Sequence, residues 1–137
     1  MQASFKREVD SLEEIFGFVR TFFRTQGIGR EYLFPVDLVV EEIFTNLVKY
    51  NRGTNADIDI RLDRTDDELT IALVDHDVDR FDITEAPEPT TDRPAEERPI
   101  GGLGLHLVRK LMDEVGYEYE DRRSTITLVK RINNDHV

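Results

Sequence analysis

Apolar residues recur at helical spacing in the stretch 33–53, which reads LFPVDLVVEEIFTNLVKYNRG. A spacing of three or four is typical of an amphipathic helix, and the apolar positions are Val36, Val39, Val40, Ile43, Leu47 and Tyr50. Pro35 can open this helix, because the first helical position needs no backbone donor. Gly53 can close it, because glycine adopts positive φ without strain. We therefore predict a helix between these two residues.

Two other stretches have the same helical period. One follows Asp10 or Ser11, either of which can serve as the N-cap, and continues to Arg24 before the segment 26–29. Its apolar positions are Leu12, Ile15, Phe16, Val19, Phe22 and Phe23. The other follows the glycine-rich turn 99–105, and its apolar positions are Leu103, Leu107, Val108, Leu111 and Met112. Each stretch predicts a helix with one buried face.

A two-residue period marks the strands. The segments that alternate are 4–9, 56–63, 68–75, 115–121 and 125–132. The weakest is 4–9, in which Phe5, Arg7 and Val9 share one face. The other four pair into two hairpins, the second with its turn at 122–124. The order strand, two helices, two strands, loop, helix, two strands predicts one α+β domain over 1–137: a two-layer sandwich of a mostly antiparallel, mixed sheet with helices on one face.

Composition narrows the function classes. The chain has 137 residues, of which 39% are hydrophobic and 34% charged, which fits a soluble domain. Its net charge of −11 argues against sequence-independent nucleic-acid binding. The chain has no cysteines, which excludes thiolate chemistry. No apolar run approaches the ~20 residues of a membrane span, and the start MQASFKREVD lacks a signal-peptide core. We therefore expect a cytoplasmic protein.

Glu42 and Asn46 are polar positions within the first helical pattern. They are four residues apart, so their side chains lie on one face of the helix. One interpretation is that both are ordinary surface residues. The other is a site in which Glu42 is a general base or orients water, and Asn46 supplies an oxygen to Mg²⁺. This ion needs few protein ligands when a nucleotide supplies others.

Between the two hairpins the regular pattern stops. Residues 76–98 contain three prolines, many acids and little to bury. A loop of this length is either functional or disordered, so the segment is a lid over a ligand or a flexible insertion. The turn 99–105 then places three glycines at a helix start. They form a hinge, or an anion site of unpaired N–H groups at the positive end of the helix dipole.

The order of elements and two motifs together resemble the Bergerat-fold ATPases, the group of gyrase, Hsp90, histidine kinases and MutL. Within that group the chain is similar to the bacterial anti-sigma-factor serine/threonine protein kinases. The segment 41–50, EEIFTNLVKY, is similar to the N box of that family. The segment 101–120, GGLGLHLVRKLMDEVGYEYE, is similar to its second glycine box and the strand after it. The resemblance covers nearly the whole chain and implies an ATP lid at about 76–101.

The resemblance also implies roles for individual residues. Glu42 resembles the catalytic glutamate that takes the proton of an attacking serine, and Asn46 resembles the Mg²⁺-binding asparagine. Asp75 resembles the aspartate that accepts a hydrogen bond from the adenine amino group. The other expected nucleotide-binding residues are Lys49, Tyr50, Phe81, Gly101, Gly102, Leu103, Gly104, Leu105 and Thr125.

One position departs from the family pattern. The first glycine box normally reads Asp-x-Gly, whereas this chain has Asp75-His76-Asp77. Glycine there permits close approach of the backbone and positive φ, which aspartate tolerates better than most residues. The carboxylate of Asp77, however, adds negative charge near an anionic ligand. Impaired nucleotide binding is therefore an alternative.

The resemblance implies an ATP- and Mg²⁺-dependent kinase that phosphorylates a STAS-type anti-anti-sigma protein and sequesters a sigma factor, as a homodimer. We expect no direct contact with nucleic acid and none with a membrane. Two alternatives stay open. One is a regulatory module, impaired in nucleotide binding, that acts by stoichiometric partner binding only. The other is a detached ATPase or kinase domain from another Bergerat branch, such as a histidine kinase.

Overall fold

The computed structural model of the chain describes residues 1–50, 53–78 and 102–132, with side chains in the last range described from residue 106. The helices and strands follow one another in the predicted order. In chain order they are β1 (Gln2–Phe5), the 3₁₀ helix η1 (Val9–Ser11), α1 (Leu12–Gln26), the 3₁₀ helix η2 (Arg30–Tyr32), α2 (Leu33–Tyr50), β2 (Ile58–Arg64), β3 (Glu68–His76), α3 (Gly102–Leu111), β4 (Glu114–Glu120) and β5 (Arg123–Arg131).

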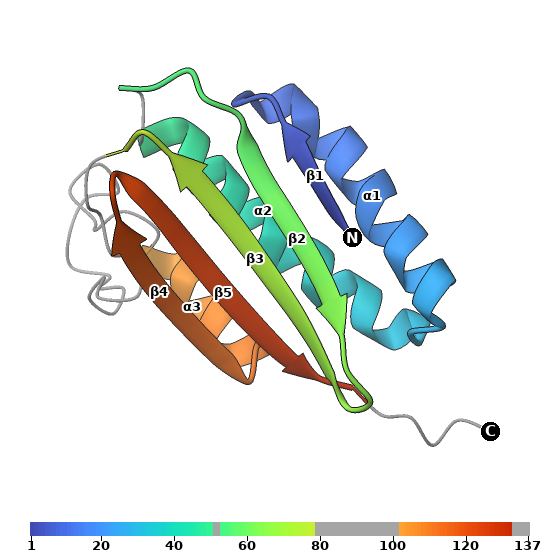
Figure 1. Cartoon of the computed structure of the whole chain (residues 1–137). Helices are drawn as coiled ribbons and strands as arrows, with labels where there is room; N and C mark the ends of the chain where they lie inside the picture. The colour runs from blue at the N-terminus through green and yellow to red at the C-terminus, as the bar shows by residue number, and fades with distance from the viewer. Residues whose placement is uncertain (51–52, 79–101, 133–137) are drawn as a thin grey trace.

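The strands form one five-stranded sheet in the order β1-β2-β3-β5-β4. Every pairing among the described strands is antiparallel. The prediction of a mixed sheet is therefore wrong, whereas the prediction of mostly antiparallel pairing is confirmed. All three α-helices cover the same face of the sheet (Figure 1). The α+β two-layer sandwich is therefore confirmed.

The core lies between these two layers. Phe44 of α2 and the sheet residues Ile60, Ile71 and Leu128 are all fully buried. Burial of an apolar side chain of this size contributes about 1.5–3 kcal/mol relative to exposure. The helix α2 lies behind the central strands, between α1 and α3 (Figure 1), which explains why six of its apolar residues are buried.

The ends of the first elements differ from the prediction. The first strand ends at Phe5 instead of Val9, because Val9 begins a 3₁₀ turn. Ser11 is at the N-cap position of α1, but its hydroxyl donates to the carbonyl of Lys6 at 2.8 Å instead of capping the helix. Gly27 follows α1 with a φ of 65°, which confirms a glycine stop.

The helix α2 begins earlier than predicted. It begins at Leu33, so Pro35 is its third residue. Proline is tolerated there because backbone N–H groups of the first turn have no partner within the helix. The described part of the helix reaches Tyr50, and residues 51–52, which precede the predicted Gly53, lie outside the described residues. No helix in the described part of the chain is long and apolar enough to cross a membrane.

Candidate functional site

Glu42 and Asn46 lie one turn apart on α2 and interact. The Nδ2 of Asn46 donates to Oε1 of Glu42 at 3.3 Å, and both residues are partly buried. Because the nitrogen of this amide is directed at the carboxylate, its oxygen is presented as an acceptor to other groups. The pair therefore places a carboxylate beside an oriented amide oxygen.

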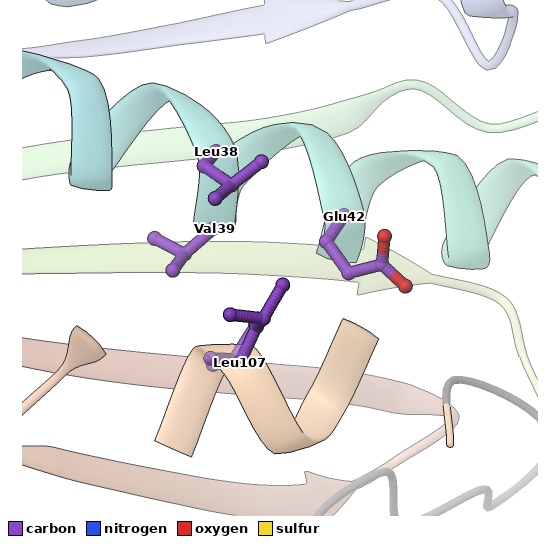
Figure 2. Close-up of a pocket in the computed structure, with 5 residues that line it drawn as sticks. Leu38, Val39, Glu42 and Leu107 are labelled. Carbon is purple, nitrogen blue, oxygen red and sulfur yellow. The ribbon is translucent and has the colours of Figure 1, made fainter. Parts of the chain in front are cut away.

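Glu42 also lines a small recess between α2 and α3 (Figure 2). The other residues that line this recess are Leu38, Val39, Leu107 and Val108. Figure 2 shows the carboxylate of Glu42 beyond this apolar wall, turned toward the C-terminal end of α2. The residue lies at the border of the buried face, as its place in the sequence pattern predicts.

Asp75 lies near the end of β3, is fully buried, and forms an ion pair with the guanidinium of Arg7. Two more hydrogen bonds hold that guanidinium: Nε donates to the carbonyl of Ala56 at 3.1 Å, and a terminal nitrogen to the carbonyl of Leu47 at 3.4 Å. Leu47 is in the last described turn of α2. Arg7 therefore joins the end of α2 to the end of β3.

The strand register assigns Ser124 to the same face of the sheet as Asp75. In the β3–β5 ladder Asp75 lies opposite Ser124, and Val74 lies opposite Thr125. Residues that lie opposite each other share a face, and both Asp75 and Ser124 are buried on the helix side. Thr125 is therefore on the other face, and Ser124 replaces it as the β5 side chain beside Asp75.

Asp77 adopts the left-handed backbone conformation that its position suggested, with a φ of 56°. Its carboxylate accepts a hydrogen bond from Nε of Arg122 at 3.0 Å. The next residue, Val78, donates its N–H to the carbonyl of Arg122 at 2.9 Å, and its own carbonyl accepts from the Tyr119 hydroxyl at 2.8 Å. The carboxylate of Asp77 is thus directed at the β4–β5 turn, where Arg122 offsets its charge.

The glycine-rich turn supplies the start of α3. This helix begins at Gly102, so the backbone N–H groups of residues 102–105 lack partners within the helix. Such N–H groups, at the positive end of the helix dipole, suit a phosphate. Gly101, Phe81 and most of the predicted lid fall in 79–101, outside the described residues.

Lys49 and Tyr50 are exposed in the last turn of α2, with Nζ of Lys49 5.2 Å from the centre of the Tyr50 ring. They share the C-terminal end of α2 with Leu47, whose carbonyl Arg7 contacts. The structure therefore brings these two predicted residues to the end of α2 that Arg7 joins to Asp75.

A family model for the histidine kinase-like ATPase domain matches residues 5–130. The chain belongs to this family. It is 33% identical over 121 residues to the serine-protein kinase RsbW of Bacillus licheniformis, covering 81% of this chain and 72% of that protein. It is 29% identical over 97 residues to the serine/threonine-protein kinase BtrW of Bordetella bronchiseptica, covering 69% of this chain and 68% of that protein. The resemblance drawn from the two motifs is confirmed.

A solved structure has the same fold as this chain. It contains the RsbU and RsbW domains of Rv1364c from Mycobacterium tuberculosis, and it superposes with a TM-score of 0.69 at 13% sequence identity. The match covers 96% of this chain but only 32% of the solved chain. The chain therefore corresponds in fold to about a third of that larger protein.

The described residues fit a nucleotide with Mg²⁺ better than a metal held by protein alone. They contain no group of three or more His, Cys, Asp or Glu side chains that could hold a metal ion. Mg²⁺ commonly binds through one or two protein oxygens together with substrate phosphates. The oriented amide of Asn46 supplies one such oxygen. Asp75 is an acceptor that suits an amino group.

Two carboxylates other than Glu42 and Asp75 have shifted pKa values. Burial raises the pKa of Asp59, but hydrogen bonds from Ser4 and His76, with the charges of His76 and Arg61, outweigh this effect and hold the pKa below its usual range. Burial also raises the pKa of Asp37, and there it dominates over the nearby charge of Arg20. His76 lies between Asp75 and Asp77 in sequence, and its ring nitrogen is 2.9 Å from Asp59.

Proposed function

We propose that this protein is an ATP-dependent serine/threonine kinase of the anti-sigma type. The observation that carries the proposal is the half-buried Glu42–Asn46 pair, with its amide nitrogen directed at the carboxylate. Membership of the histidine kinase-like ATPase family and the names of its kinase relatives support the same activity. Fixed backbone N–H groups at the start of α3 suit the phosphates.

In this proposal the chain acts mainly by positioning. Asn46 offers its amide oxygen to Mg²⁺, Asp75 accepts a hydrogen bond from the adenine amino group, and Ser124 lies beside it. When bound beside Asn46, Mg²⁺ would offset the negative charge of the phosphates during transfer. Glu42 accepts the proton of the acceptor hydroxyl while the hydroxyl oxygen bonds to the γ-phosphorus. The bond between this phosphorus and the leaving ADP breaks.

The protein substrate that we propose is a STAS-type anti-anti-sigma protein, and the partner that this chain holds once that substrate is phosphorylated is a sigma factor. Phosphorylation of the STAS protein would leave this chain free to sequester the sigma factor, as a cytoplasmic homodimer. The net charge of −11 is compatible with a basic patch on a partner protein.

The alternative is a regulatory module that binds partners but not nucleotide. It rested on the carboxylate at Asp77. The hydrogen bond from Arg122 directs that carboxylate toward the β4–β5 turn, which favours the kinase over the alternative.

Two substitutions on α2 test the proposal. Glu42→Gln keeps the size of the side chain and removes the base, so we expect Mg·ATP binding to persist while transfer falls at least about 100-fold. Asn46→Ala removes the amide oxygen, so we expect Mg²⁺-dependent ATP binding to be lost. The measurements are calorimetric titration with ATP, with and without Mg²⁺, and phosphate transfer to a STAS protein encoded in the same genome.

The control is Glu41→Gln, which changes the neighbouring exposed carboxylate of the same helix. This variant should bind and transfer like the unmodified protein. Full transfer activity in Glu42→Gln would remove Glu42 as the base. Absence of ATP binding by the folded, unmodified protein would favour the binding module.

A further inference from the structure

Arg7 belongs to no motif that the sequence offers, yet it contacts the carboxylate expected to recognise the base. Its side chain is only 7% exposed and that of Asp75 is 0% exposed. Its three partners lie 40, 49 and 68 residues away along the chain, at Leu47, Ala56 and Asp75. A long basic side chain buried to this extent must have its donors satisfied.

The contacts around Arg7 explain how this ion pair is tolerated. Desolvation of two charges is expensive unless geometry is good and additional hydrogen bonds satisfy the remaining donors. The carbonyl groups of Ala56 and Leu47 provide those hydrogen bonds. The Leu47 carbonyl is also at the negative end of the α2 dipole, where a cation is favoured. The guanidinium is thus fixed from three sides.

We propose that Arg7 sets the base selectivity of the nucleotide site by holding the carboxylate of Asp75 in place as an acceptor. This inference rests on the proposed kinase function and adds a positioning residue to it. An ionised carboxylate only accepts hydrogen bonds, and its two oxygens can accept several at once. A carboxylate can therefore accept from a guanidinium and from an amino group at the same time. The 6-amino group of adenine is a donor, whereas the 6-oxo group of guanine is a second acceptor and is repelled.

Without the guanidinium this discrimination weakens. A buried carboxylate that has lost its cation is costly and is driven toward its neutral form. A neutral carboxyl group donates as well as accepts, so it can pair with either purine. Arg7 thus acts on the base through Asp75 and does not need to touch the nucleotide.

The test compares the Kd values for Mg·ATP and Mg·GTP by calorimetry in matched variants. Arg7→Met keeps the length of the side chain and removes its charge. We expect its preference for ATP over GTP to fall by about tenfold or more, the difference between a hydrogen bond to a charged and to a neutral group. Arg7→Lys keeps the charge and should retain most of the preference. The control is Arg20→Met, which makes the same change at an exposed arginine of α1 that pairs with Asp37 of α2. This variant should keep the ATP preference of the unmodified protein.

The outcomes separate a selectivity role from a structural one. An unchanged ATP-to-GTP ratio in folded Arg7→Met overturns the inference, whether both affinities stay constant, fall together or rise together. If Arg7→Met does not fold, the double variant Arg7→Met/Asp75→Asn leaves no buried charge unpaired and should show the same loss of preference. Failure of the unmodified protein to bind ATP overturns the kinase proposal and this inference together, whereas normal binding with an unchanged ratio overturns this inference alone.

Discussion

The backbone at Asp77 has the conformation that glycine would adopt most easily. Its φ of 56° is in the left-handed region, which costs most residues about 1–2 kcal/mol and aspartate less. The side chain partly offsets that cost through its hydrogen bond with Arg122. Since both partners are more than half exposed, this ion pair contributes only about 0–1 kcal/mol. The two effects nearly cancel.

Substitutions at Asp77 separate backbone strain from charge. Asp77→Gly should change the free energy of unfolding by less than about 1 kcal/mol, because relief of strain offsets the lost ion pair. Asp77→Ala loses the ion pair and keeps the strain, so it should be less stable by about 1–2 kcal/mol. Urea denaturation measures both. ATP affinity should be similar in Asp77→Gly and the unmodified protein, and a large gain in affinity would show that the carboxylate obstructs the nucleotide.

Among single residues, those within a regular helix were the easiest to predict. Glu42 and Asn46 interrupt a strong apolar period, and the structure shows them in contact. Asp75 was predicted only from the resemblance to the family, and the structure shows that it is buried near the end of β3. Arg7 was placed on the same face as Phe5, but only contacts 40–68 residues away along the chain reveal that this face meets Asp75.

At the scale of elements, strand interiors were predicted more accurately than turns. The turn between β4 and β5 is only Asp121-Arg122, both with positive φ, which is the two-residue hairpin geometry usually built from Asn and Gly. The sequence lacks those residues, and the predicted turn 122–124 was one residue too long. This error left Ser124 in the turn and placed Thr125 first in the strand. The alternation of Ser124 with the inward Ile126 was the signal that could have corrected it.

A glycine within α1 and the glycine that follows it give a matched test of how that helix ends. Gly27 has a φ of 65° and Gly17 is an exposed helical position, and an added Cβ would meet nothing within 4 Å at either. Steric space is therefore equal and only backbone conformation differs. Gly27→Ala should lower the free energy of unfolding by about 1 kcal/mol, whereas Gly17→Ala should raise it by about 0.5–1 kcal/mol. Equal effects in thermal denaturation would contradict the assigned helix end.

At the scale of the whole molecule, the candidate residues collect at one end of the sandwich. The end of α2, the end of β3 and the start of β5 lie together there (Figure 1). The antiparallel register brings Asp75 opposite Ser124, and Arg7 brings the N-terminal segment to the same end. Periodicity predicted the layers but not this convergence, because strand order and register depend on contacts between distant segments.

A ligand that bridges these elements should stabilise the whole domain. Binding to the folded state alone adds about 2.7 kcal/mol when the ligand is at 100 times its Kd, which for a domain of this size raises Tm by roughly 5–10 °C. We expect this rise with Mg·ATP in differential scanning calorimetry. It should shrink when EDTA removes Mg²⁺ and shrink to the same extent in Asn46→Ala, while Glu41→Gln should keep it. An equal rise with and without Mg²⁺ would show that the nucleotide binds without Mg²⁺. The role of Asn46 as a Mg²⁺ ligand would then be wrong.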